Sequence, residues 1–85
     1  MLITTTKRAL SKARLAAGTL PPGGRLAGLV ERTDGTFGAL CRLPNGHYVQ
    51  VNAGVVRSLS QAAVGRALLN QGDHRQAEPG RRPAR

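Results

Sequence analysis

Residues 25–52 read RLAGLVERTDGTFGALCRLPNGHYVQVN and contain two strong turn signals, Thr33–Gly35 and Pro44–Gly46. In each signal an Asp or Asn precedes a Gly, which suits a type I turn followed by a residue in the left-handed region. The runs on either side of the turns are rich in β-branched and aliphatic residues. The sequence therefore predicts a three-stranded antiparallel β-meander over about residues 25–52, with the second strand in the centre.

The register of this meander follows from the loops, because three-residue loops place Arg32 opposite Thr36 and Leu43 opposite His47. One predicted face is then almost wholly apolar, with Glu31 and His47 as its polar members near the strand ends. The apolar members of this face are Ala27, Leu29, Phe37, Ala39, Cys41, Leu43, Val49 and Val51. The opposite face is mixed and collects Leu26, Gly28, Val30, Arg32, Thr36, Gly38, Leu40, Arg42, Tyr48, Gln50 and Asn52. A slip of one residue in either loop would scramble the apolar face, which favours this register.

A helix is predicted on the N-terminal side of the meander, over about residues 6–17. Thr6 can cap it, and Gly18 can end it in the left-handed conformation. Its apolar arc consists mainly of alanines, and its basic arc carries Lys7, Arg8, Lys12 and Arg14. Two prolines and two glycines in residues 20–24 cannot continue the helix and indicate a linker.

A second helix is predicted over about residues 59–70. Ser58 and Gln61 have the spacing of a capping box, and Gly72 is expected to end the helix. Its apolar residues surround most of the cylinder, so we expect it to pack on the sheet. Residues 53–57 indicate a bend or a short extra strand, and the polar, basic residues 73–85 indicate a disordered tail.

These elements predict an α+β fold in three segments. Residues 1–24 form the basic helix and the Pro/Gly linker, residues 25–72 form the core of meander plus helix, and residues 73–85 form the tail. A chain of 85 residues with two aromatic side chains has a thin core. We therefore also expect that it can self-associate through a sheet edge, as a homo-oligomer.

Composition excludes several classes of protein. The single cysteine, Cys41, can form neither an intramolecular disulfide nor a four-ligand metal site, and we expect no metal and no cofactor. No apolar run is long enough for a membrane span, so we expect no membrane contact and a cytoplasmic location. The acid-free residues before Gly18 would also suit a transit peptide.

The sequence offers little that could support catalysis, and we expect no enzyme. Two of the four acids, Glu31 and Asp34, lie at one turn, and the other two lie in the predicted tail. Cys41 and His47 share a predicted face and could form a nucleophile with its base, but Cys41 also fits as a small core residue.

The charge points instead to an anionic partner, since 13 Lys and Arg oppose four Asp and Glu and give a net charge of +9. Arg32, Arg42 and Tyr48 lie on the mixed face, where Arg can bind phosphate and Tyr can stack on a base. Gln50 and Asn52 lie beside them and can read an adenine edge. The candidate nucleic-acid-binding residues are Lys7, Arg8, Lys12, Arg14, Arg32, Arg42, Tyr48, Gln50 and Asn52.

Two functions remain open at this point. The first is a small, non-catalytic, nucleic-acid-binding accessory or regulatory protein for DNA or RNA. The second is a protein-binding module, a small inhibitor or adaptor that docks on an acidic partner through Leu26, Val30 and Leu40, which arginines surround. The mixed face itself has three interpretations, which are contact with nucleic acid, cover by a helix, or simple solvation.

The residues Gly28–Glu31, Phe37, Asn45–His47, Val49 and Val51 resemble the first three strands of small OB-fold RNA-binding proteins, such as bacterial translation initiation factor one. The likeness covers about a third of the chain. It implies RNA binding, but the closing fourth and fifth strands of that fold are missing from the prediction. The sequence therefore assigns the chain to no family.

Overall fold

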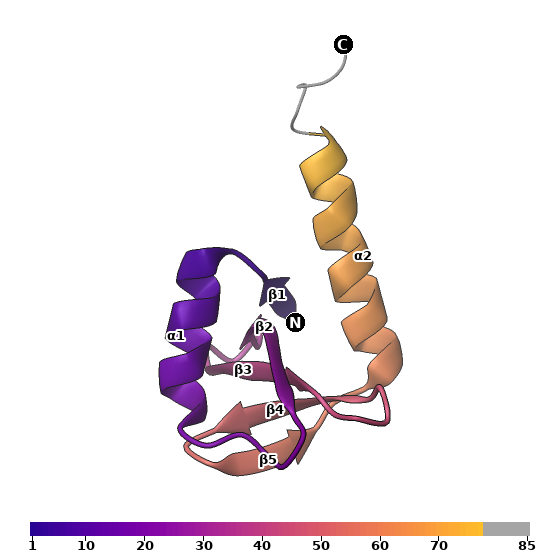
Figure 1. Ribbon diagram of the computed structural model, residues 1–85. Helices are drawn as coiled ribbons and strands as arrows, with labels where there is room; N and C mark the ends of the chain where they lie inside the picture. Colours follow the sequence, from indigo (N-terminus) through magenta and orange to yellow (C-terminus); the bar gives the residue numbers. More distant parts are fainter. Residues whose placement is uncertain (78–85) are drawn as a thin grey trace.

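The computed structural model describes the backbone of residues 1–77 and the side chains of residues 1–70. Over these residues the elements are β1 (Leu2–Thr4), α1 (Lys7–Ala17), β2 (Arg25–Glu31), β3 (Phe37–Arg42), β4 (Tyr48–Asn52), β5 (Val55–Ser58) and α2 (Gln61–Ala77). The strands form one antiparallel sheet in the order β1-β2-β3-β4-β5 (Figure 1). The α+β class is therefore confirmed, but the sheet has five strands and not three.

Both predicted turns are confirmed. The Arg32 amide donates to the Thr36 carbonyl at 2.8 Å, which closes the first three-residue loop. The Leu43 amide closes the second loop in the same way, at 2.8 Å from the His47 carbonyl. The glycine of each loop has φ +89°, in the left-handed region that the turn requires. The predicted central strand is β3, as expected.

A β-bulge in β2 corrects the predicted faces at one end of the sheet. The pairing of β2 with β3 shifts by one residue between Leu26 and Gly28, so Ala27 is an extra residue. Leu26 consequently joins the core under α1, and Ala27 joins the core under α2, the reverse of the prediction. Gly28 lies so close to β1 that a Cβ there would be 3.0 Å from the Thr4 carbonyl oxygen.

Helix α1 covers the predicted apolar face of the sheet (Figure 1). Thr6 caps it, because its hydroxyl accepts a hydrogen bond from the Ala9 amide at 3.1 Å. Ala9, Ala13 and Ala17 are buried one turn apart, against a core formed by Leu29, Ala39, Cys41 and Val51. Side chains this small let the helix lie close to the sheet, which offsets the small area that each alanine buries.

The turn between β4 and β5 secures the other end of α1. Ala53 and Gly54 both have positive φ, at +51° and +79°, as a tight two-residue hairpin turn requires. Their amides donate to the carbonyls of Ala16 and Ala17 at 2.8 and 2.7 Å. The C-terminal end of α1 leaves carbonyls without a partner inside the helix, and this turn donates to two of them. The turn lies about 36 residues further along the chain.

Both edge strands lie outside the predicted meander. The segment 53–57, expected to be a bend or a short strand, holds a two-residue turn and the first three residues of β5, which continues to Ser58. Strand β1 was not predicted, since three residues are too few for a clear alternating pattern. Its Ile3 pairs with Val30 and is 1% exposed, so β1 belongs to the core.

Helix α2 differs from its prediction at both ends. It begins after Ser60, whose hydroxyl accepts from the Ala63 amide at 3.2 Å, whereas Ser58 belongs to β5. It continues past Gly72 to Ala77, because a glycine inside a helix costs only about 1 kcal/mol and does not by itself end it. Residues 73–77 are thus helical and not a tail, and residues 78–85 lie outside the described part of the chain.

Helix α2 covers the apolar part of the mixed face, around Val30 and Leu40, whereas Arg42 on the same face stays exposed. Val64, Val30 and Leu40 are each 0% exposed and form a second core cluster with Ile3. Leu59, Ala67 and Leu68 pack at its margin. The protein therefore has three layers, with α1 on one face of the sheet and α2 on the other (Figure 1).

Candidate nucleic-acid interface

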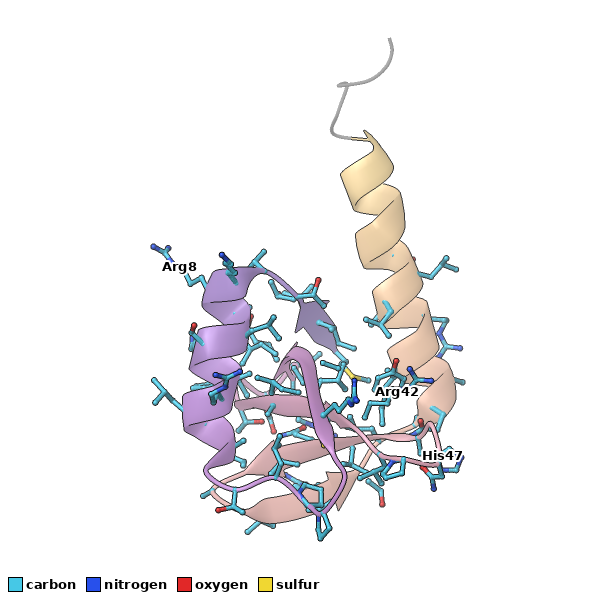
Figure 2. All side chains as sticks on the ribbon, in the orientation of Figure 1. Arg8, Arg42 and His47 are labelled. Carbon is cyan, nitrogen blue, oxygen red and sulfur yellow. The ribbon has the colours of Figure 1, made fainter. Side chains whose placement is uncertain are left out.

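The four predicted basic residues of α1 all lie exposed on the helix. The buried alanines of α1, which we call the alanine ridge, face the sheet. The four cations therefore lie on the remaining faces of the helix, and Arg8 points away from the sheet (Figure 2). The Lys12 ammonium group lies 4.5 Å from the centre of the Phe37 ring, a cation–π contact that fixes its position. Leu15 is 85% exposed on the same helix.

These cations have no acidic counterpart on their helix. The first turn of α1 contains no acid, and residues 1–70 contain no ion pair between a cation and a carboxylate. Asp34 instead bonds to the hydroxyl and the amide of Thr36, and these hydrogen bonds hold the pKa of Asp34 below its usual value. The basic surface of α1 is therefore free for an external anion.

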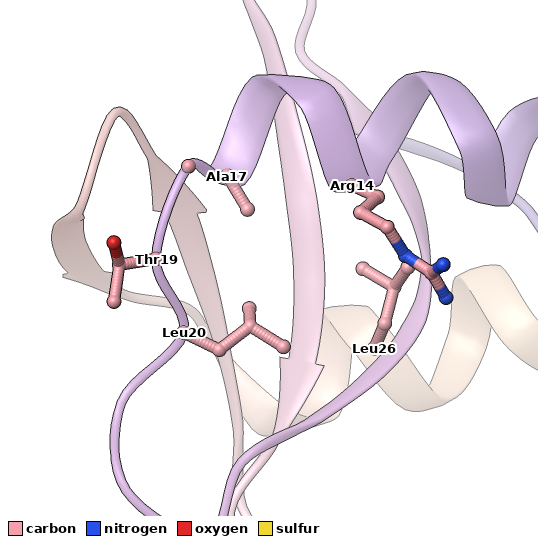
Figure 3. Close-up of a pocket in the computed structure, with 6 residues that line it drawn as sticks. Arg14, Ala17, Thr19, Leu20 and Leu26 are labelled. Carbon is pink, nitrogen blue, oxygen red and sulfur yellow. The ribbon is translucent and has the colours of Figure 1, made fainter.

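A hollow of about 460 Å³ opens beside the C-terminal end of α1 (Figure 3). Its floor is apolar, formed by Ala17, Leu20 and Leu26, and the Arg14 side chain lies next to Leu26. The bulge in β2 places Leu26 here. This hollow extends the basic surface of α1 with an apolar recess.

The predicted residues of the sheet lie on the side of the sheet opposite α1. Gln50 is 2% exposed, and its side-chain oxygen accepts a hydrogen bond from Arg32 at 2.9 Å. Gly38 leaves room for this side chain, because a Cβ there would lie 2.9 Å from Gln50 Nε2. The Asn52 amide donates to the Phe37 carbonyl at 2.7 Å. Gln50 and Asn52 thus bond within the fold.

Tyr48 and Arg42 lie next to each other across β4 and β3. Tyr48 is half-buried against the second core cluster, and its backbone is held at both polar atoms by Gln61. The Gln61 amide accepts from the Tyr48 N–H at 2.7 Å and donates to its carbonyl at 2.8 Å, as a neighbouring strand would. Arg42 is exposed.

Sequence reasoning missed Arg25, which pairs with Arg42 across β2 and β3. An unbroken β2 would have placed Arg25 on the α1 side, and the bulge at Ala27 turns it to the side of Arg42. The two arginines line a hollow of about 240 Å³ together with Gly23, Leu43 and Pro44. No local signal in the sequence identifies this pair, because the register of β2 shifts by one residue at a bulge that the alternating pattern does not show.

The structure therefore separates the predicted residues into two groups. Arg8 and Arg42 lie on opposite sides of the sheet, with α1 carrying the first and the α2 side carrying the second (Figure 2). Cys41 is 0% exposed beneath α1, and burial raises the pKa of its thiol, which favours the unreactive protonated form. His47 is exposed at its turn.

Two further features of the described residues concern membranes and metals. No helix in residues 1–77 combines the length and the apolar character that crossing a bilayer requires. Within the same part of the chain, no three His, Cys, Asp or Glu side chains gather as a metal ion would need. No protein-family model, curated protein or solved structure matches this chain.

Proposed function

We propose that this protein is a small, non-catalytic, nucleic-acid-binding accessory or regulatory protein that contacts phosphates through α1. The observation that carries the proposal is that Lys7, Arg8, Lys12 and Arg14 are all exposed on one helix, with no acid among them and no ion pair to any of them. Basic side chains that contact a nucleic acid release counterions from its phosphates, which favours binding of either DNA or RNA.

The geometry of α1 supports this role better than simple solvation does. Solvated helices usually mix charges of both signs, which relieves repulsion within the helix. Here each cation repels its neighbours, and a polyanion would relieve that repulsion. The alanine ridge fixes the orientation of the helix, so all four cations stay on the solvent side.

The sheet residues support phosphate contact more than base reading. Gln50 is buried and so is not offered to a base edge, and exposed Asn52 already donates one side-chain N–H to the Phe37 carbonyl. Arg32 is half-buried and bonded to Gln50. Arg42 remains exposed, and Tyr48 presents only part of its ring.

The alternative, a module that docks on an acidic protein, loses the apolar surface that suggested it. Val30 and Leu40 are both 0% exposed beneath α2. Leu26 lies on the other side of the sheet, under α1. An acidic protein partner would therefore have to use a different surface.

A filter-binding titration over a range of salt concentrations tests the proposal. Contact with about six phosphates predicts that log K falls against log[salt] with a slope near −5 for a duplex. Replacement of Lys7, Arg8, Lys12 and Arg14 by Gln removes four cations, and we expect the slope to become shallower by about 3.6.

The matched control is the variant Arg57→Gln/Arg66→Gln, because both arginines are exposed and neither lies on α1. We expect its slope to stay close to that of the wild type. Absence of binding at low salt, or affinity independent of salt, would remove the proposal.

A further inference from the structure

We infer that Arg25 and Arg42 form a second phosphate-binding site on the side of the sheet opposite α1, so that one molecule holds two nucleic-acid duplexes at once. This inference rests on the proposed function, since it takes the ligand to be a nucleic-acid phosphodiester. It goes further in that it assigns a separate site and a bridging role.

The two arginines are cross-strand neighbours at the end of the sheet where β2 begins and β3 ends. Both are exposed, and they share the walls of the hollow of about 240 Å³. Gly23 and Pro44 form one wall of this hollow, and they are closely packed. A Cβ on Gly23 would lie 2.7 Å from Pro44 Cγ.

Two like charges opposite each other in an antiparallel pair destabilise the pair. No carboxylate offsets this repulsion, because residues 1–70 contain no ion pair. Glu31 lies at the far end of β2, opposite Phe37, and Asp34 bonds to Thr36. A bound phosphate would remove the repulsion, and a pair of planar guanidinium groups suits its oxygens in a bidentate geometry.

The neighbouring residues add no negative charge. On the other side of Arg42 lies Tyr48, whose backbone is fixed by Gln61 at the start of α2. The first turn of α2 contains no acid, so the positive end of its helix dipole is not neutralised there. The turn after β3 ends in His47, which is exposed beside it.

The separation of the two sites is what implies bridging. Arg8 and Arg42 lie on opposite sides of the three-layered fold (Figure 2). Duplex DNA has a persistence length of about 150 base pairs, so a short duplex is a stiff rod on the scale of this protein. A stiff duplex on the Arg8 side of α1 has the sheet between it and Arg42, so the Arg25–Arg42 hollow is left for a second duplex.

A capture assay tests this inference. One short DNA duplex is immobilised, the protein is added at low salt, and a second, fluorescent duplex is then supplied. We expect the wild type to retain the fluorescent duplex. The variant Arg25→Gln/Arg42→Gln should still bind the immobilised duplex through α1 but capture less than about a tenth as much fluorescence, because the loss of two charge-assisted contacts weakens binding by more than tenfold.

The variant Arg57→Gln/Arg66→Gln is the matched control, since it removes the same charge from two other exposed positions. It should capture nearly as much as the wild type. Equal capture by the two double variants would overturn the inference, because bridging would then come from overall charge or from self-association. A wild type that binds the first duplex without capturing the second would also overturn it and leave the proposed function intact. A wild type that binds neither the DNA duplex nor RNA at low salt would refute the proposed function itself.

Discussion

The two faces of the sheet are buried in different ways. On one face, three alanines of α1 lie flat against the strands, and the turn at Ala53 and Gly54 pairs the end of the helix. On the other, α2 packs through Val64 with Ala67 and Leu68 at the margin, and it then extends beyond the sheet (Figure 1). The first face depends on close fit of small side chains, and the second depends on a few larger ones.

This difference also separates what each helix can do on its outer side. The buried residues of α1 are all alanines, so the charged residues of this helix occupy its exposed positions. The helical spacing of these residues in the sequence therefore predicts its basic outer surface. The apolar residues of α2 surround the helix, and Leu69 is 64% exposed. The comparison predicts that a larger side chain on the inner face of α1 lowers the stability of the fold. On the α2 side, a smaller side chain or a buried charge should lower it.

The largest effect is expected from a charge at the centre of the α2 side. Leu40→Asp places a carboxylate at a position that is 0% exposed, with no cation paired to it. We expect a loss above about 4 kcal/mol, enough to unfold a domain of this size. Circular dichroism with urea titration measures this. Leu69→Asp, at an exposed position of α2, should change stability by less than about 0.5 kcal/mol. A folded Leu40→Asp variant would mean that this face is not core.

The next effect tests the close fit on the α1 side. Ala13 is 0% exposed between the helix and the sheet, so Ala13→Leu forces the two apart. We expect a loss of about 3 kcal/mol in the free energy of unfolding, from overpacking. Ala62→Leu, at an exposed position in α2, serves as the control and should be nearly neutral. Similar stability of the two variants would contradict the close packing of α1.

A smaller loss is expected when volume is removed from the α2 side. Val64→Ala deletes two methyl groups at a position that is 0% exposed, and we expect a loss of about 2 kcal/mol. The same change at Val55, which is 60% exposed on β5, should cost less than about 0.5 kcal/mol. If Val64→Ala costs no more than Val55→Ala, α2 does not bury this side of the sheet.

The smallest effect concerns pH and the α1 side. Burial raises the pKa of the Cys41 thiol above its ordinary value of 9.0, so the unfolded state loses this proton first as pH rises. The protonated thiol makes its full contribution to the free energy of unfolding below pH 9.0. That contribution is lost as the pH rises above 9.0, by no more than about 1.4 kcal/mol per pH unit. Urea titrations at several pH values from about 8 to about 10 measure the free energy of unfolding of the wild type and of Cys41→Ala. Parallel pH dependence of the two proteins would show that the thiol is not buried.

Several elements could be predicted because their causes are local. The glycines at 35 and 46, each after an Asp or Asn, define both turns within a few residues, and the register of the central strands follows. The capped helix α1 also follows from neighbouring residues, with Thr6 at its start and Gly18 at its end. The exposed cations of the candidate interface are equally a consequence of the helical period.

Other elements depend on contacts between distant segments. The bulge at Ala27 lies next to Gly28, where the Thr4 carbonyl at the end of β1 comes close to the backbone, and it decides the sides on which Arg25 and Leu26 lie. The prediction for Gln50 assumed an open sheet face, but that side chain is 2% exposed and accepts a hydrogen bond from Arg32. Ser58 has the residue type of an N-cap for α2, but it pairs within the β4–β5 hairpin and belongs to β5.

The amino-acid sequence by itself determined the two turns, the central strand pairing and the basic outer surface of α1, because each depends on dihedral preferences or periodicity over a few residues. Only the tertiary structure decided which helix covers which face, and that Arg25 lies beside Arg42. Those outcomes depend on how β1, α1 and α2 compete for the same apolar surface, and that competition involves residues far apart in the chain.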